Sequence, residues 1–402
     1  MKKILLALCL ALTALSAWAV KADPTPVVVI QPDGTKLTIC QHGDEHFSWL
    51  TTTDGVLLSQ VGNAFYVAHI SESGELTATR QIAHNPNLRS ASETMIVRAQ
   101  DKGAFFSAAT QAIRMIRKAQ SIGSTSPAYF PHIGSPKVLV ILTQFSDSTF
   151  AAADPVKSFN DYFNHKGKLP DYTLNEKRNY GSVKQYFHDM SNGMFTPQFD
   201  IVGPITLPKP GSYYGQDEGY RKDTKITELI HDACNAVSGT VNFDEYDSNN
   251  DGNIDLVYIL YAGYSQSSAP HLKDLIWPKA GTLYPFKVGN KNVSRYGVSN
   301  ELNYYPGYEL SAAPYKRING IGLFCHEFSH TMGLPDFYPY AASAQKDDQA
   351  MEIWDLMDGG EYTDNGYTPT PYTPWEKEVM GWSSLQTIGS EPAKITLQAD
   401  QA

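Results

Sequence analysis

Thiols and basic residues are scarce in this chain of 402 residues. It has four cysteines, and Cys9 lies within an apolar N-terminal run, which leaves Cys40, Cys234 and Cys325 for the folded part. A sparse, odd set of thiols argues against a disulfide scaffold. Lys and Arg together number 32 against 42 Asp and Glu, a net charge of -10, and no basic stripe is present. This balance argues against nucleic acid as a partner.

Long apolar runs are also missing after the N-terminus, so the sequence predicts no membrane span. The first twenty residues follow the order of a signal peptide: the positive pair Lys2-Lys3, the short apolar run Ile4–Leu15, and the small residues of Ala17-Trp18-Ala19. A buried N-terminal helix is the alternative interpretation. We predict that residues 1–19 are a signal peptide, cleaved after Ala19 or Ala22, and that the protein is secreted.

Residues 27–82 consist of short β-rich runs separated by turn-forming pairs such as Asp54-Gly55. Three of the expected strands are Thr35–Cys40, Val56–Gln60 and Ala64–Ile70. A basic helix is expected from Lys102 to Ala119, followed by a loop rich in Gly, Ser and Pro. Exposed loops are preferred sites of proteolysis. We therefore predict a small β-rich prodomain over residues 20–125, which an activating protease releases.

Continuous apolar runs and amphipathic helical patterns alternate in the rest of the chain. Lys137–Leu142 and Leu256–Tyr261 are expected to be buried strands. Ser182–Phe195 and Thr224–Val237 are expected to be helices with one apolar face, and Met194 belongs to the first of these faces.

The run from His326 to Asp336 carries a metal-binding pattern. His326 and His330 are four residues apart, so on a helix both rings project from one face and can bind one Zn²⁺ at about 2.0–2.1 Å. Gly333 permits the turn that ends the helix and presents Asp336 as a third ligand. Three protein ligands leave the fourth position for water, as in a catalytic site. Zinc lowers the pKa of that water to about 7, and Glu327 can take its proton.

Two other interpretations of this run were weighed. A chance arrangement of His and Glu on an ordinary helix does not explain the glycine and the acid that follow at the spacing of a zinc motif. A thiol protease using Cys325 is disfavoured, because Cys325 directly precedes His326 and a nucleophile and its base normally come from separate elements. We expect Cys325 to be a core residue of the helix.

The run from His326 to Asp336 resembles the extended zinc motif of metzincins, in the variant where Asp replaces the third His. Residues Ile353–Gly360 look like the Met-turn of that clan, in which Met357 lies beneath the zinc ligands as an apolar cushion. Further segments are similar to the immune inhibitor A-like family of secreted metallopeptidases: Tyr180–Phe195, Val202–Pro204, Tyr213–Gly215 and Trp375–Trp382. The likeness covers about residues 137–382.

This resemblance implies an α+β fold, a metzincin-like catalytic domain with a twisted mixed sheet and an active-site helix, preceded by the small β-rich prodomain. We place the catalytic domain at residues 126–385. Residues 386–402, with a strand at Lys394–Gln398, are expected to begin a C-terminal β domain. One departure is that no Tyr stands two residues after Met357; Tyr362 is the nearest, and it has no assigned role.

Oxygen-bearing side chains recur at every second position of the loop that begins at Asp247, with Gly252 at its sixth position. They are Asp247, Asn249, Asp251, Asn253 and Asp255. This is the spacing of an EF-hand-type calcium loop, although Tyr258 stands where a bidentate Glu closes that loop. A plain polar turn is the alternative. We predict a structural calcium ion here, and the family resemblance supports it.

The run Cys40–His46 in the predicted prodomain gathers several zinc-binding side chains around Gly43. A thiolate or carboxylate of a pro-segment can silence a zymogen by occupying the open position of the zinc ion. Cys40 and Asp44 are the candidates for this latency ligand. An ordinary strand end and turn is the alternative, as is a prodomain that blocks the cleft sterically.

Taken with the resemblance, these features predict a secreted zinc-dependent endopeptidase made as a zymogen. It would hydrolyse peptide bonds in extracellular proteins by Glu-assisted attack of a zinc-bound water, with protein or peptide substrates as partners and Zn²⁺ and Ca²⁺ as cofactors. A secreted adhesion or binding module with a non-catalytic metal site is the alternative, and a zinc hydrolase with a non-peptide substrate is a third. The intact base Glu327 disfavours the adhesion module.

Overall fold

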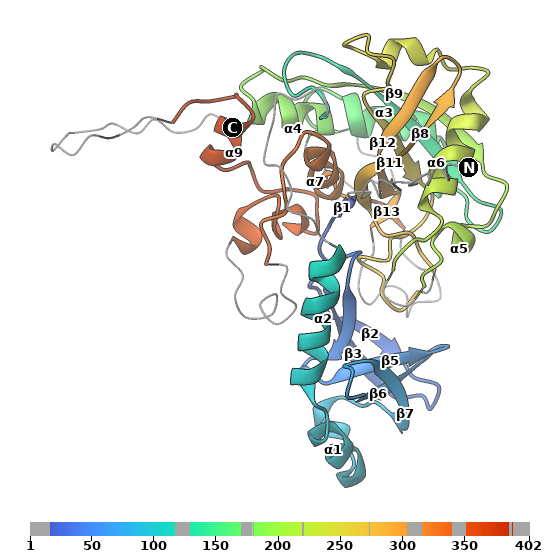
Figure 1. Cartoon of the computed structure of the whole chain (residues 1–402), viewed down its shortest axis with the longest axis vertical. Helices are drawn as coiled ribbons and strands as arrows, with labels where there is room; N and C mark the ends of the chain where they lie inside the picture. Colours follow the sequence, from blue (N-terminus) through green and yellow to red (C-terminus); the bar gives the residue numbers. More distant parts are fainter. Residues whose placement is uncertain are drawn as a thin grey trace, which may run out of the picture.

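A computed structural model describes residues 17–116, 129–169, 179, 181–218, 221–272, 274–303, 316–339, 351–385 and 388. These residues form two units (Figure 1). The N-terminal unit comprises residues 24–116, and the larger C-terminal unit comprises residues 129–385. A leading segment, residues 17–23, contacts both units. The predicted boundary at residue 125 and the strand expected at Lys394–Gln398 lie outside the described residues.

The N-terminal unit is built on a six-stranded antiparallel sheet whose strands follow sequence order. The strands are β2 (Val27–Ile30), β3 (Lys36–Gly43), β4 (Ser48–Thr52), β5 (Leu57–Val61), β6 (Ala64–Ile70) and β7 (Leu76–Ile82). Tight turns connect them, and Gly34 and Gly55 adopt φ of 82° and 77°, which other residues rarely adopt. The predicted antiparallel sheet is confirmed, with the three expected strands at β3, β5 and β6.

Two helices, α1 (Ala91–Arg98) and α2 (Lys102–Ile116), accompany this sheet (Figure 1). An aromatic cluster holds α2 in place: the ring centroids of Phe47, Trp49 and Phe105 are 5.7 to 6.0 Å apart. All three side chains are buried. Large aromatic side chains supply much of the apolar burial that a small core needs.

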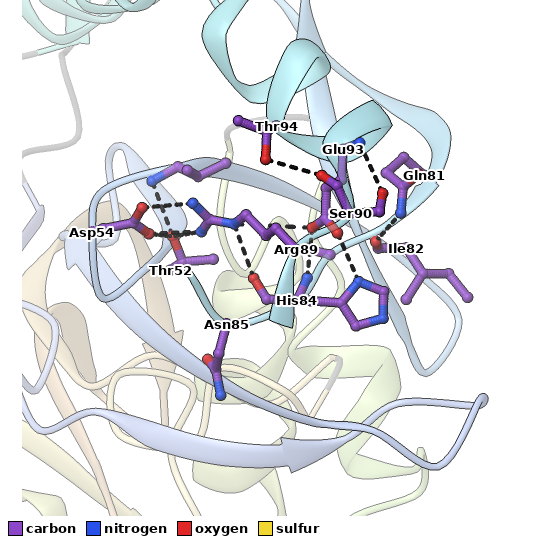
Figure 2. A network of polar contacts seen from close by, with 12 residues as sticks. Thr52, Asp54, Gln81, Ile82, His84, Asn85, Arg89, Ser90, Glu93 and Thr94 are labelled. Carbon is purple, nitrogen blue, oxygen red and sulfur yellow. Dashed lines mark hydrogen bonds and ion pairs between the residues drawn. The ribbon is translucent and has the colours of Figure 1, made fainter. Parts of the chain in front are cut away.

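A polar network around Arg89 joins the start of α1 to the strands (Figure 2). The Arg89 guanidinium donates to both carboxylate oxygens of Asp54, at 2.6 and 2.7 Å, and to the hydroxyl of Thr52 at 3.2 Å. The backbone N–H of His84 donates to the carboxylate of Glu93 in α1 at 2.8 Å. A bidentate pair of this kind fixes both the orientation of the Arg89 guanidinium and its distance from Asp54. It therefore fixes the position of the start of α1 relative to the sheet.

The C-terminal unit has a six-stranded mixed sheet at its core. In spatial order its strands are β1 (Ala17–Ala19), β11 (Lys279–Val288), β12 (Lys291–Asn300), β10 (Val257–Tyr261), β8 (Lys137–Gln144) and β9 (Gln198–Thr206). The last four are parallel, β11 is antiparallel to β12, and β1 is antiparallel to β11. A separate pair joins β13 (Leu302–Asn303) to β14 (Arg317–Ile318). The predicted mixed sheet is confirmed.

Helices cover both faces of this sheet (Figure 1). On one face α3 (Pro155–Asn164), α4 (Val183–Met190) and α7 (Ile321–Thr331) share an apolar cluster with Val140. On the other face α6 (Ile226–Val237) shares a cluster with Leu139, since neighbouring strand residues point to opposite faces. The short elements are α5 (Gly211–Tyr214), α9 (Pro374–Val379) and the 3-10 turns Pro86–Leu88, Phe243–Tyr246, Glu352–Trp354 and Gly360–Tyr362.

One helix is shorter than the sequence predicted. The helix expected at Ser182–Phe195 ends at Met190, and Met194 is 39% exposed, so the prediction that Met194 packs in the core was wrong. Asn192 and Gly193 have φ of 52° and 79°, values that a right-handed helix cannot contain, and they turn the chain away.

The N-terminal unit packs on a loop of the C-terminal unit between β10 and β11. Ala269 of this loop is fully buried in the cluster that contains Val27 and Leu37. The amide of Gln60 donates to the carbonyl of His271 at 3.2 Å. Of the helices that the structure describes, none is both long and apolar enough to cross a bilayer. The three described cysteines carry no disulfide.

Candidate metal centre

Helix α7 carries both histidines of the motif and is buried along its whole length. Its N-cap is Gly320, where a Cβ would lie 2.1 Å from the carbonyl carbon of Gly366, so a larger residue would force this loop away. Phe324 and Phe328 pack on the sheet, which fixes the rotation of the helix and hence the direction of its histidines. As predicted, Gly333 ends the helix with a left-handed φ of 101°.

The two histidines and Asp336 converge on one point. The Nε2 atoms of His326 and His330 are 3.1 Å apart. Oδ1 of Asp336 lies 3.3 Å from the first and 3.2 Å from the second. Each Nδ1 faces a backbone carbonyl, that of Leu356 at 2.8 Å for His326 and that of Leu334 at 2.7 Å for His330. Because a carbonyl only accepts, each Nδ1 donates and each Nε2 of a neutral ring directs a lone pair at the shared point.

This geometry fits a zinc ion. Ligand atoms that bind tetrahedral zinc at 2.0–2.1 Å are about 3.3 Å from one another. The three separations here run from 3.1 to 3.3 Å. Two nitrogen lone pairs and a carboxylate oxygen at such distances repel unless a cation lies between them. In the described part of the chain, His326, His330 and Asp336 are the one group of three potential ligands gathered this closely.

The surrounding charges also favour a cation. Burial opposes a proton on His326, but its hydrogen bond to Asp336 and the nearby charges of Glu361 and Glu327 raise its pKa to about 10. Burial would raise the pKa of Asp336, yet the two histidines hold it below its ordinary value. The field that favours a proton on His326 also attracts a divalent ion, and a bound ion takes the place of that proton.

Glu327 lies beside the ligands with no exposed surface. Its Oε1 accepts the backbone N–H of Val20 at 2.7 Å. Burial raises the pKa of this carboxyl well above its ordinary value; the charge of His326 opposes the shift, and the charge of Glu45 in the N-terminal unit adds to it. A raised proton affinity suits a carboxylate that accepts a proton from water.

Met357 is fully buried in the apolar cluster that also contains Cys325 and Phe328 of α7. Its carbonyl accepts the N–H of Phe337 at 2.8 Å, which ties it to the residue after the ligand Asp336. Burial raises the pKa of Cys325 well above its ordinary value, so this thiol stays protonated. Its place in the core agrees with the sequence expectation and argues against Cys325 as the nucleophile of a thiol protease.

Several buried carboxyls lie behind the ligands, and the sequence analysis did not single them out. Glu361 lies 4.0 Å from Nδ1 of His326, and burial raises its pKa to about 8. Asp355 accepts the N–H of Met357 at 2.7 Å, and burial raises its pKa to about 6. The acidic residues that flank Met357 in the sequence are the feature from which these buried carboxyls could have been predicted.

The leading segment crosses this centre. Val20 is fully buried, and its carbonyl accepts from the indole Nε1 of Trp277 at 2.9 Å. The carbonyl of Lys21 accepts from the hydroxyl of Tyr362 at 2.7 Å. The sequence predicted signal-peptide cleavage after Ala19 or Ala22, and it gave no indication of a role for Tyr362. Local sequence holds no sign of which sheet edge a short segment joins.

Neither candidate latency ligand belongs to the metal group. Cys40 is half-buried on β3 and lines a cavity shared with Lys21. Asp44 uses Oδ1 to accept two backbone N–H groups of the turn that follows it, at 2.8 and 3.1 Å. The prediction that one of these side chains ligates zinc therefore finds no support in their placement. The group that lies against Glu327 is the backbone of the leading segment.

The side chains expected to bind calcium lie in one loop and bond mainly to its own backbone. They are Asp247, Asn249, Asp251, Asn253 and Asp255. Oδ1 of Asp247 accepts the N–H of Asp251 at 3.0 Å, and Oδ1 of Asp251 accepts the N–H of Asn253 at 2.8 Å. The ammonium of Lys291 lies 2.7 Å from Oδ2 of Asp247. Part of the negative charge of the loop is thus compensated by the chain itself.

Comparison with known proteins bears on the same region. The chain is 28% identical over 308 residues to immune inhibitor A of Bacillus thuringiensis subsp. alesti, a match that covers 67% of this chain and 43% of that protein. It is 24% identical over 272 residues to the pre-pro-metalloprotease PrtV of Vibrio cholerae serotype O1 (strain M66-2), covering 58% of this chain and 28% of that protein. The chain thus spans less than half the length of these relatives.

A family model gives the broader assignment. Residues 131–386 match the family described as immune inhibitor A peptidase M6, catalytic domain. This match takes in most of the C-terminal unit, with α7, Asp336 and Met357. The relatives named above are similar over much of the same chain. The chain belongs to the immune inhibitor A peptidase M6 family of metallopeptidases.

Proposed function

We propose that this chain is a secreted zinc-dependent endopeptidase, made as a zymogen, which hydrolyses peptide bonds in extracellular proteins with Glu327 as general base. The observation that carries the proposal is the convergence of two Nε2 atoms and one carboxylate oxygen at 3.1 to 3.3 Å, directly beside a buried glutamate. The ligands are His326, His330 and Asp336. Three protein ligands are the number found in catalytic rather than structural zinc sites.

When bound, the zinc ion supplies a Lewis acid that polarises a carbonyl and lowers the pKa of a water molecule to about 7. Glu327 accepts a proton from water at its carboxylate and passes it to the nitrogen of the departing amine. The transfer of a proton from Glu327 to the departing nitrogen is supported by the position of Val20. Its peptide nitrogen lies 2.7 Å from Oε1 of Glu327. The carbonyls that hold Nδ1 of His326 and His330 keep both rings oriented before any ligand arrives.

The proposal includes a metzincin-like catalytic domain. Its support is the mixed sheet, the buried helix α7 and the burial of Met357 in the cluster of that helix. The edge strand β11 runs antiparallel to its neighbour, and β1 adds to its open side. An extended substrate can join a sheet edge of this kind.

Latency is part of the same proposal. The leading segment lies against the base through Val20, and the N–H of Ala22 donates to the carbonyl of Gly43 in the N-terminal unit at 2.8 Å. The N-terminal unit, acting as a prodomain, therefore holds the segment in the cleft. Removal of a signal peptide after Ala19 would leave the new terminal nitrogen of Val20 against Glu327.

A calcium ion in the loop from Asp247 to Asp255 is a separate, structural part of the proposal. Alternate oxygen side chains and the left-handed Gly252, with φ of 88°, support it. Lys291 at Asp247 supplies a competing positive charge, so the effect on stability should be modest.

Casein digestion tests the proposal. The protein recovered from culture medium after processing should cleave casein, lose this activity with a zinc chelator, and regain it when zinc is restored. The unprocessed precursor should be inactive under the same conditions. Digestion that persists after the metal is removed and verified absent would contradict the assignment, and digestion by the precursor would contradict latency.

A further inference from the structure

The leading segment lies against α7 and the edge of the sheet in an extended form. Strand β1 pairs antiparallel with the edge strand β11, with Ala17 opposite Gly281 and Ala19 opposite Lys279. In Figure 1 this strand, in dark blue, lies beside α7. Proteins commonly bind an extended peptide by adding it as a strand to a sheet edge, because the edge offers unpaired N–H and C=O groups.

The contact with Glu327 sets the register of this segment. A carboxylate that protonates a departing amine must lie about 2.6–3.2 Å from the amine nitrogen. The nitrogen of Val20 lies 2.7 Å from Oε1 of Glu327. The nitrogen of Val20 therefore lies where the departing amine of a cut peptide bond would lie. Lys21 is then the second residue after that bond.

Side chains of the C-terminal unit hold the backbone beyond this point. The indole of Trp277 donates to the carbonyl of Val20 at 2.9 Å, and the hydroxyl of Tyr362 donates to the carbonyl of Lys21 at 2.7 Å. Contacts of this kind do not distinguish one substrate sequence from another, since every residue has a backbone carbonyl. Selection among substrates has to come from side-chain pockets.

The side chain of Lys21 meets a buried acid. Its Nζ lies 3.6 Å from Oδ1 of Asp358, a residue with no exposed surface. Oδ2 of Asp358 accepts the N–H of Glu352 at 2.8 Å, which fixes the carboxylate. Oδ1 has no hydrogen bond within the described residues, and the Lys21 ammonium is the charge that faces it. A buried carboxylate oxygen in this state is strongly destabilised without a cationic partner.

We infer that Asp358 forms the floor of a substrate pocket that selects lysine or arginine at the second residue after the scissile bond. The inference rests on the proposed peptidase activity and adds a specificity residue to it. Lys21 fills the pocket in the precursor, and the basic side chain of a substrate fills it in the processed enzyme. An acidic residue at this substrate position is repelled by Asp358, and a neutral one leaves Oδ1 without a partner.

Peptide cleavage by the processed enzyme is the first test. Four peptides share the core Ala-Val-X, where X is Lys, Arg, Gln or Glu, and kcat/KM is measured for cleavage between Ala and Val. We expect Lys and Arg to exceed Gln by about tenfold, with Glu lowest, as for other charge pairs that are partly desolvated. Equal values for all four would overturn the pocket. Failure to cut any peptide would overturn the proposed peptidase activity instead.

Matched variants connect this preference with Asp358. Asp358→Asn should bring the Lys, Arg and Gln peptides within about twofold of one another, since the charge that distinguishes them is removed. Asp364→Asn removes the same charge from an exposed position nearby and should keep the preference. A preference for Lys that survives in Asp358→Asn would overturn the assignment.

Hydrogen exchange in the precursor gives a readout without catalysis. Lys21→Gln should speed exchange at the amides of Ala22 and Asp23, which donate to the carbonyls of Gly43 and Ser267, about tenfold, since the segment loses its side-chain anchor. Lys21→Arg should restore slow exchange because it keeps the charge. Equal exchange in wild type and Lys21→Gln would overturn the pocket even if no peptide were cleaved.

Discussion

Carboxyl groups from the two units show opposite pKa shifts, and the cause differs between them. In the N-terminal unit Asp54 lies near the surface, and its hydrogen bonds to the Arg89 guanidinium lower its pKa to about 2 (Figure 2). In the C-terminal unit burial raises the pKa of Glu301 to about 7 and that of Glu376 to about 8. A paired surface carboxylate adds stability when ionised, whereas a buried one with a raised pKa opposes folding when ionised.

The difference follows from what each set of charges does. The pairs around Arg89 fasten a helix to a sheet. The buried acids of the C-terminal unit, among them Asp355 and Glu361, surround His326 and make the centre strongly attractive to a cation. Such a cluster is unfavourable by itself, and a divalent ion makes it favourable. Stability is given up at a functional site and recovered elsewhere in the fold.

The largest expected effect concerns the base. Glu327→Gln should lower casein hydrolysis by at least about 10²–10⁴-fold, since proton transfer is lost. Zinc content should stay at one ion per chain, because Glu327 is not a ligand. The melting temperature should not fall, since the amide oxygen can still accept from the N–H of Val20. Activity assays with metal analysis on the same preparation decide the point, and a variant with normal turnover would remove Glu327 from the mechanism.

Next in size is the loss of a ligand. Asp336→Ala should weaken zinc binding by more than about 100-fold, because even an outer hydrogen-bond partner of a ligand is worth about 10–100-fold. Asp355→Asn is the control, since it removes a neighbouring buried charge that is not a ligand. Zinc content after dialysis distinguishes the two. Equal zinc retention by both variants would show that buried charge in general, rather than Asp336, holds the ion.

The pH dependence of stability should differ between the units. The carboxyl of Glu301, which has no exposed surface, has a folded pKa of about 7 against an ordinary 4.5. The folded state therefore binds a proton more tightly, and stability falls as pH rises from about 4.5 through 7, by about 3 kcal/mol in all. Asp54 acts in the opposite direction, and its contribution is lost as pH falls from about 4 through 2.

Denaturant unfolding of wild type and Glu301→Gln at pH 5 and pH 8 measures this effect. The variant should lose the part of the pH dependence that Glu301 contributes and keep the part that comes from Glu361, Asp355 and Glu376, whose pKa values are also raised. An equal change in unfolding free energy between pH 5 and pH 8 in both proteins would mean that Glu301 does not titrate in this range.

A smaller effect is expected from the network in Figure 2. Arg89→Ala should lower the unfolding free energy of the N-terminal unit by about 1–2 kcal/mol, since a bidentate charged contact is lost. Arg80→Ala, at an exposed position of β7, should cost less than about 0.5 kcal/mol. Denaturant titration of both variants compares them. An equal cost would show that the surface pair contributes nothing beyond an ordinary exposed arginine.

The smallest expected effect is that of calcium. Adding Ca²⁺ should raise the melting temperature by about 2–4 °C, equivalent to about 1 kcal/mol for a unit of this size. Asp251→Asn should abolish this response, and Asp364→Asn, outside the loop, should keep it. A melting temperature independent of calcium in wild type would leave residues 247–255 as a turn closed by Lys291.

Much of the fold followed from local patterns. The antiparallel sheet of the N-terminal unit and helix α6 carry a period of apolar residues, β8 and β10 are continuous apolar runs, and α7 carries two histidines at helical spacing. The end of α4 did not follow, because the apolar period runs on to Met194 while the backbone turns at Asn192. The backbone conformation of Asn192 and Gly193 ended the helix although the apolar period continued.

The sequence by itself predicted that the three proposed zinc ligands lie together, because His326 and His330 face the same way on any helix and Gly333 brings Asp336 back to them. The resemblance also predicted Met357 as the Met-turn residue, and the sequence disfavoured Cys325 as a nucleophile. The tertiary structure alone decided what lies in the cleft. Val20 and Glu327 are 307 residues apart, and their contact depends on a short strand joining one sheet edge. Strand pairing over such distances leaves no local trace in the sequence, because any extended segment offers the same backbone groups.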